Sequence, residues 1–389
     1  MDASRFIASR LRFKGRIASV TICVSFLVMI VAVSISSGFR HEIRNGISAV
    51  AGDIQLTPPN MNVLDEGMPV DANPSYLSDI ESLGFVDGIR PAVYRAGIVK
   101  AGENIQGVLF KGTLDFQPDT AALGVSVPSR FTELTGLAVG DDVTAYFVGE
   151  KVKARRFRIT DVHNSILQAD DRLVLNVSMK DLQRLNGWGD EDVSAIEILL
   201  APSHKDEASI KEAARNIGFI ANAYSADSDR PVIATSSVSR YPQLFDWLSL
   251  IDFNVLFILA IMTVVAGVNM ISGLLIMLFE HISTIGLLKA LGMTDKAIAK
   301  VFLSCSASAV LKGMAAGNIL ALLFCLVQGT THLLRLDPEN YFVPFVPVSV
   351  DPWLILAADA ASFAVIMVLL LVPCLFVSRV DPADTVRYS

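Results

Sequence analysis

The sequence predicts a membrane protein with four transmembrane helices, arranged one plus three, and a large extracytoplasmic α+β domain between the first and second helices. Three observations support this fold class: one apolar stretch near the start, three more in the last third, and a long polar segment between them. In hydrocarbon only a helix satisfies its own backbone groups, so each apolar stretch is expected to be a spanning helix.

The expected transmembrane helices are residues 17–38, 248–279, 301–332 and 353–377. Each is long enough for a hydrocarbon core of roughly 30 Å, which takes about 20 helical residues. The first stretch is too long for a signal peptide and lacks a small-residue cleavage site. Cys23 does not fit a lipid-anchored cysteine, because Ile22 fills a place that needs a small residue. We therefore expect an uncleaved anchor.

Lysine and arginine in the short segments predict the orientation. They gather in the N-terminus (1–16), in the loop 280–300 and in the tail (378–389), namely Arg5, Arg10, Arg12, Lys14, Arg16, Lys289, Lys296, Lys300, Arg379 and Arg387. The loop 333–352 has only Arg335. The sequence thus predicts a multi-pass membrane protein with both termini and the 280–300 loop in the cytoplasm, and with 39–247 and 333–352 outside.

The external segment is expected to fold without disulfides. All four cysteines, Cys23, Cys305, Cys325 and Cys374, lie within the apolar stretches. A segment of about 200 residues can bury a core without them. The formal net charge of −7 arises mainly outside the membrane, so nucleic acid is not expected as a partner.

Hydrophobic patterning divides the external segment into two subdomains. A helical continuation over 40–51 leads to a strand (53–57) and a helix (75–83), and a similar order recurs as a strand (195–200), a helix (206–216) and a strand (219–224). These pieces predict a split α+β subdomain of about 52–106 and 193–240. The strands expected between them, 108–111, 142–148, 151–160 and 172–177, predict an inserted β-rich subdomain of about 107–190.

Motifs for catalysis or metal binding are missing from the sequence. It has no G-x-x-x-x-G-K-[ST] loop, no G-x-S-x-G elbow and no paired His and Glu at metal spacing. We expect a chain that is not an enzyme, with no catalytic residue and no cofactor or metal of its own.

The sharpest local signal follows the second transmembrane stretch. Ile285, Leu287, Leu288 and Leu291 predict a short apolar-faced helix, Gly292 a C-cap, and Thr294 or Asp295 the next N-cap. A helix too short to span the membrane and too apolar for free solution needs a groove in a partner. The alternative is a helix resting on the membrane surface.

The chain resembles the FtsX/MacB-type permeases of ABC transporters. The resemblance rests on the run IGLLKALG, the tail VPCLFVSRVDPADTVRYS and the one-plus-three layout. The segments IQGVLFKGTLDF and LDPENYFVPFVPVSVD make it most similar to the LolC/LolE-type lipoprotein-releasing proteins, and it covers nearly the whole chain. Thr284 departs from the acidic residue that members often carry before the IG pair.

The resemblance implies a dimer of permeases, either two copies or a copy and a paralogue, with cytoplasmic ABC ATPase subunits that bind ATP and Mg. It implies a coupling helix docked on the ATPase, whose matching residues here are Glu280, Ile285, Gly286, Leu287, Leu288, Lys289, Leu291 and Gly292. The motion would pass through the stalk and release a lipoprotein from the inner membrane to a periplasmic carrier. The alternatives are MacB-like export, FtsX-like signalling, or a membrane-anchored receptor without an ATPase.

Two further site predictions concern the membrane. Acyl chains need an apolar lining at a lateral opening, and the candidates for this lining are Met29, Val33, Leu250, Phe253 and Leu256. These residues also fit ordinary contacts with membrane lipids or packing between helices. Lys312 and Asp359 lie at roughly similar depths, counted at about 1.5 Å per residue, and form a candidate ion pair. The alternative is that each reaches its own membrane surface.

Overall fold

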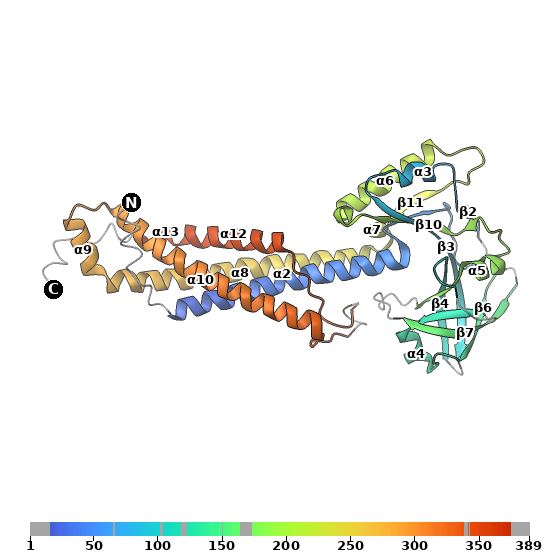
Figure 1. Cartoon of the computed structure of the whole chain (residues 1–389), viewed down its shortest axis with the longest axis horizontal. Helices are drawn as coiled ribbons and strands as arrows, with labels where there is room; N and C mark the ends of the chain where they lie inside the picture. The colour runs from blue at the N-terminus through green and yellow to red at the C-terminus, as the bar shows by residue number, and fades with distance from the viewer. Residues whose placement is uncertain are drawn as a thin grey trace. The chain divides into compact units, whose positions relative to one another are not determined.

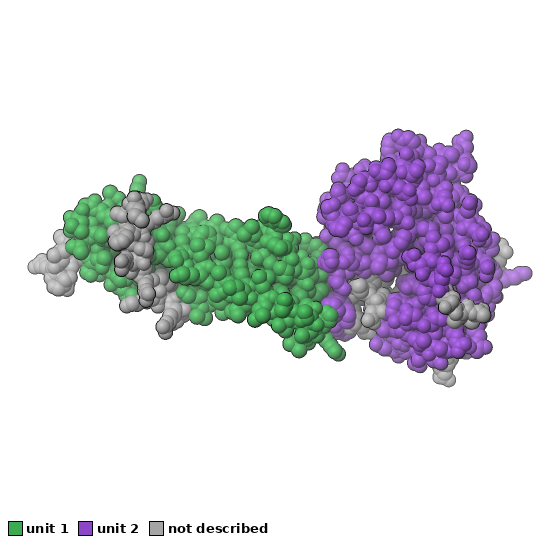
Figure 2. Space-filling view, in the orientation of Figure 1, with its two compact units in different colours: residues 1–40, 247–335, 346–389 green, residues 41–246, 336–345 purple. Residues whose placement is uncertain are grey.

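The computed structural model describes residues 16–64, 67–101, 104–117, 123–149, 151–163, 173–337, 341 and 343–374. The chain forms two compact units (Figure 2). Unit 1 comprises residues 1–40, 247–335 and 346–389, and unit 2 comprises residues 41–246 and 336–345. The predicted tail (378–389), the N-terminal residues 1–15 and the last three residues of the predicted fourth span lie outside the described residues.

Within the described residues, four helices are long and apolar enough to cross a membrane (Figure 1), as the sequence predicts. They are α2 (Arg16–Ala51), α8 (Pro242–Glu280), α10 (Asp295–Thr331) and α12 (Pro352–Leu369), which continues into α13 (Leu371–Cys374). The short α9 (Ile282–Ala290) joins α8 to α10. The expected helical continuation of the first span is present, because α2 runs unbroken to Ala51.

The spanning helices of unit 1 pack through apolar and small residues. Phe26 and Met29 of α2, Met270 of α8 and Ile366 of α12 are fully buried in one cluster. Glycines let α10 approach α2, because a Cβ added at Gly317 would lie 2.5 Å from the carbonyl oxygen of Cys23. Without a hydrophobic driving force between helices, such close contacts supply much of their association.

Unit 2 contains an antiparallel sheet in the order β11-β1-β10-β3. Its strands are β11 (Ile233–Ser236), β1 (Ile54–Thr57), β10 (Ala195–Leu200) and β3 (Val86–Ala101). Helices α3 (Leu77–Glu81) and α6 (Glu207–Ala223) pack with this sheet, and α7 (Ser237–Arg240) follows β11. The strands expected at 53–57 and 195–200 are therefore confirmed.

The strand expected at 219–224 is wrong, because residues 219–223 form the last part of α6. Asp206 caps this helix by accepting a hydrogen bond from the Ser209 N–H. Its buried residues, Ile210, Ala213, Ala214, Ile217 and Ala221, keep helical spacing beyond the predicted end. The helical stripe continues through the segment, whose Phe219 is exposed.

The remaining strands close into a barrel with the second half of β3. Around the barrel the order is β3-β4-β8-β5-β7-β6, and β6 pairs back onto β3. The strands are β4 (Asn104–Thr113), β8 (Leu173–Ser178), β5 (Gly124–Pro128), β7 (Lys153–His163) and β6 (Asp142–Phe147), accompanied by α4 (Ser129–Thr135) and α5 (Met179–Asn186). A small pair, β2 (Val70–Asp71) and β9 (Asp192–Val193), and a 3₁₀ turn (Pro202–His204) complete the unit.

Aromatic packing fills the barrel. Phe110 lies with its ring centroid 5.0 Å from that of Phe147 and 5.1 Å from that of Phe157. The barrel begins earlier than the insertion expected from residue 107, since β3 pairs with β4 from Val93 onward. Before that point, up to Ala92, β3 pairs with β10. One long strand thus belongs to both the sheet and the barrel.

Candidate functional site

Helix α9 is held in place at its C-terminal end. Gly292 follows it with φ of 87°, and its N–H donates to the carbonyl of Lys289 at 2.9 Å, while the Met293 N–H donates to Leu288 at 3.0 Å. Only a residue that tolerates the left-handed region fits this C-terminal stop readily. Lys289 also forms an ion pair with Asp295, at the start of α10, at 2.9 Å.

The apolar residues of α9 point to two different sides. Ile285 is 1% exposed within the core of unit 1, and Leu288 packs against that same core. Leu287 and Leu291 are 58% and 76% exposed. The predicted docking face is therefore divided: Ile285, Gly286 and Leu288 belong to the inner side, and Leu287 and Leu291 form the outer side together with Ala290. Glu280, the last residue of α8, is exposed.

The buried acid in the membrane part has a partner that the sequence reasoning missed. Asp359 of α12 is 6% exposed, and its Oδ2 accepts a hydrogen bond from Asn318 Nδ2 of α10 at 2.5 Å. Lys312 is exposed, and no ion pair joins it to Asp359, both being described residues. Six residues at about 100° each place Lys312 and Asn318 on different sides of α10. The predicted ion pair between Lys312 and Asp359 is therefore wrong, because the depth count took no account of how α10 is rotated.

The predicted lipid-entry lining does not form one surface within this chain. Met29 and Val33 are 0% and 4% exposed among the helices, whereas Leu250, Phe253 and Leu256 are 60%, 66% and 63% exposed on α8. The helical spacing of the first pair matches core packing. The α8 residues remain an open apolar stripe of this chain.

A polar contact joins α2 and α8 where both leave the apolar region. Arg40 forms an ion pair with Asp252 at 2.6 Å, and Ser36 Oγ donates to the same carboxylate oxygen at 2.7 Å. Phe39 packs edge-on against Trp247 with ring centroids 5.5 Å apart. Two features of the sequence could have indicated this contact. Asp252 is an acidic residue one turn inside the second apolar stretch, and Arg40 follows the end of the first apolar stretch.

Comparison with known proteins shows what the chain is similar to. Residues 256–382 match the family model described as FtsX-like permease C-terminal. The chain is 22% identical to the lipoprotein-releasing system transmembrane protein LolC of Neisseria meningitidis, over 95% of this chain and 92% of that protein. It is 21% identical to the lipoprotein-releasing system transmembrane protein LolE of Haemophilus influenzae, over 95% of this chain and 93% of that protein.

Among solved structures, the periplasmic region of MacB from Actinobacillus actinomycetemcomitans aligns at 12% identity and a TM-score of 0.31, covering 51% of this chain and 95% of that one. The matched permease segment contains α9, α10 and α12 and most of α8. Residues 256–382 therefore resemble an FtsX-like permease segment, and the chain is similar over most of its length to the LolC and LolE transmembrane proteins.

Proposed function

We propose that this chain is an ABC transporter permease of the inner membrane that uses ATP hydrolysis on separate ATPase subunits to release lipoproteins toward the outer membrane. ATP and Mg would bind the ATPase subunits, and a second permease, either a copy or a paralogue, would complete the membrane part. A periplasmic carrier would receive the lipoprotein. The lipoprotein substrate is supported by the full-length similarity to proteins named for lipoprotein release.

The observation that carries the coupling part of this proposal is the outer side of α9. Leu287 and Leu291 are one helical turn apart and largely exposed. Burying such a side chain in a partner groove yields about 1.5–3 kcal/mol. The inner side of α9 is fixed to unit 1 through Ile285. A push on the outer side would therefore reach α8 and α10 rather than be lost in a loose loop.

The exposed stripe of α8 supports a role for the membrane part in handling acyl chains. Leu250, Phe253 and Leu256 present large apolar side chains in the part of α8 nearest to the external domain in sequence. A second permease subunit facing this stripe would enclose an apolar space in which acyl chains lose their contact with water.

A charge on the outer side of α9 tests the coupling. In the full chain co-expressed with its ATPase, Leu287→Asp should abolish ATPase co-purification and ATP-driven release, because the contact would bury an unpaired carboxylate. Thr294→Asp is the matched control: it adds the same charge to an exposed N-cap position of the same loop, where aspartate is well tolerated. Full ATPase binding by Leu287→Asp would overturn the docking surface.

The substrate is tested separately with the intact complex in lipid nanodiscs. Acylated proteins should co-purify with the complex and leave the nanodisc on ATP addition, while a non-acylated version of the same protein should do neither. If an intact, ATP-hydrolysing complex shows no preference for the acylated form, the substrate assignment is wrong and export or signalling on another partner takes its place.

A further inference from the structure

The last turn of α2 ends in a set of charged and polar side chains in unit 2. Lys111 Nζ donates to the carbonyl of Val50 at 2.7 Å, Arg90 donates to that of Ser48 at 3.1 Å, and the Tyr94 hydroxyl oxygen lies 3.2 Å from the Val50 carbonyl oxygen. The last carbonyls of a helix have no partner within the helix and carry its negative dipole end. Cationic donors from β3 and β4 therefore satisfy the end of α2.

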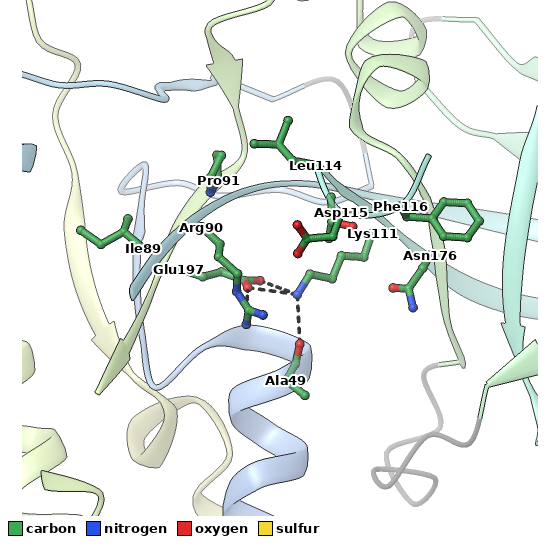
Figure 3. Close-up of a pocket in the computed structure, with 11 residues that line it drawn as sticks. Ala49, Ile89, Arg90, Pro91, Lys111, Leu114, Asp115, Phe116, Asn176 and Glu197 are labelled. Atoms are coloured by element: carbon green, nitrogen blue, oxygen red, sulfur yellow. Dashed lines mark hydrogen bonds and ion pairs between the residues drawn. The ribbon is translucent and has the colours of Figure 1, made fainter. Parts of the chain in front are cut away.

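One buried carboxylate holds these donors together. Glu197 is 1% exposed, and its Oε1 lies 2.8 Å from Lys111 Nζ, whose side chain is 5% exposed. Arg90 lies 3.5 Å from Glu197 Oε2, and the Tyr94 hydroxyl donates to Glu197 Oε1. Figure 3 shows Arg90 and Lys111 converging on Glu197 next to Ala49 at the end of α2. We call Arg90, Tyr94, Lys111 and Glu197 the clasp.

The strand ladders explain why the four clasp residues meet. Glu197 of β10 lies opposite Arg90 in the sheet, and Lys111 of β4 lies opposite Tyr94 in the barrel. Arg90 and Tyr94 lie on either side of the point where β3 passes from the sheet into the barrel. The clasp thus contacts the helix end, the sheet and the barrel at their common junction.

Dense packing does not hold the helix end on this side. A cavity of about 440 Å³ borders the clasp and is lined by Ala49, Arg90, Lys111, Asn176 and Glu197 among others. The polar contacts of the clasp span the space beside this cavity. Gly52, with φ of 67°, turns the chain so tightly that a Cβ there would lie 3.0 Å from Glu197 Cβ.

A buried ion pair is weak support for stability, because well-packed apolar residues often replace one without loss. Apolar residues cannot replace the directional geometry of these contacts, because a hydrogen bond constrains the angle between donor and acceptor. The clasp aims donors at three successive carbonyls of α2, those of Ser48, Ala49 and Val50. It therefore resists rotation and sliding of the helix end relative to β3 and β4.

We infer that the clasp residues are positioning residues that fix the end of α2 to the sheet and the barrel, so that the motion of α2 moves the external domain as one body. This inference rests on the proposed function for its transport consequence but not for its structural content. Because α2 is one unbroken helix from Arg16 to Ala51, force on its membrane part arrives at this junction.

The structural content is tested by spin labels in the full chain reconstituted with its ATPase, in a background without the four native cysteines. One pair of labels, at His41 of α2 and Lys100 of β3, reports the distance between the helix and the barrel. A second pair, at Lys100 and Glu212 of α6, reports the distance between the barrel and the helix that packs with the sheet. All three positions are exposed.

The informative variant is Lys111→Met combined with Glu197→Leu, which removes the Lys111 donor and the carboxylate that holds the clasp together, while the remaining charge, Arg90, is 37% exposed. The distance distribution between His41 and Lys100 should be narrow in the wild type and at least twofold broader in this variant, with the second pair unchanged. The separate variant Lys111→Arg keeps a long cationic donor, so its distance distribution should remain narrow. A narrow distribution in the double variant would overturn the inference.

The transport consequence is measured on the same samples as substrate released per ATP hydrolysed. This ratio should fall about tenfold or more in the double variant, while the ATPase rate stays at the wild-type level and Lys111→Arg stays coupled. An unchanged ratio in a variant with a broadened distribution would overturn the transport role. If the substrate assignment itself fails, no variant or wild-type sample releases acylated protein, yet the distance measurements still decide the clasp.

Discussion

Replacing Gly317 by alanine should force α2 and α10 apart. The added Cβ would lie 2.5 Å from the carbonyl oxygen of Cys23 and 2.9 Å from Phe26 Cβ. Carbon and oxygen atoms in contact normally keep about 3.3–3.6 Å. Both obstructing groups belong to or adjoin a helix backbone and cannot rotate away. The two helices must therefore separate by roughly 1 Å, and overpacking of this kind costs about 1–3 kcal/mol.

The cost is measurable as a lower midpoint of unfolding when the full chain in mild detergent is titrated with a denaturing detergent. Ala316→Leu is the matched control. Ala316 is exposed on the same helix, and its replacement by leucine adds more volume than the replacement of Gly317 by alanine. The expected order of stability is wild type, Ala316→Leu, then Gly317→Ala. A Gly317→Ala chain as stable as the wild type would refute the close approach of the helices.

Three further perturbations follow from named contacts. Burial lowers the pKa of His163 below 6.5, although Asp161 opposes the shift, so the folded chain binds this proton less readily than the unfolded chain. Stability should fall as pH drops below 6.5, and the slope should flatten in His163→Gln, as measured by denaturant midpoints of the full chain at pH 7.5 and 5.5. Asn318→Leu removes the partner of the buried Asp359 and should cost about 1–3 kcal/mol in the detergent titration, part of which Asp359→Leu should return. Arg40 and Asp252 are 36% and 42% exposed, so neutralising either should cost only about 0.2–1 kcal/mol, and a double-mutant cycle with no coupling would remove this contact from the account.

The transmembrane helices were predictable because length and apolarity leave the chain one solution in hydrocarbon. The stop at Gly292 was predictable for a similarly local reason, the left-handed backbone conformation. Short apolar runs in the external domain carry no such constraint. The run Phe219–Tyr224 fits a strand or a helix by pattern, and the stripe that begins at Ile210 makes it a helix.

Contacts between distant segments were beyond the sequence pattern. Glu197 lies in a run of buried strand residues, and its ion-pair partner Lys111 is 86 positions away. The hydrophobic pattern identifies Glu197 as a strand residue, but it does not identify the cation that compensates the charge of its carboxylate. The position of Asp359 along α12 gave its depth, whereas its partner Asn318 depends on how α10 is rotated, which one sequence does not specify.

The pairing of β1 has a consequence for how the chain matures. Ile54 pairs with Ile198, 144 positions later by subtraction of the two residue numbers, and with Ser236 still further on. At about 5–20 residues per second of synthesis, this first strand waits roughly 7–29 s for its first neighbour. During that interval its unpaired, apolar edge is a template for wrong pairing with other chains. A truncation before β10 makes the interval permanent, so such incomplete chains should be recognised and degraded at the membrane rather than persist as partly folded domains.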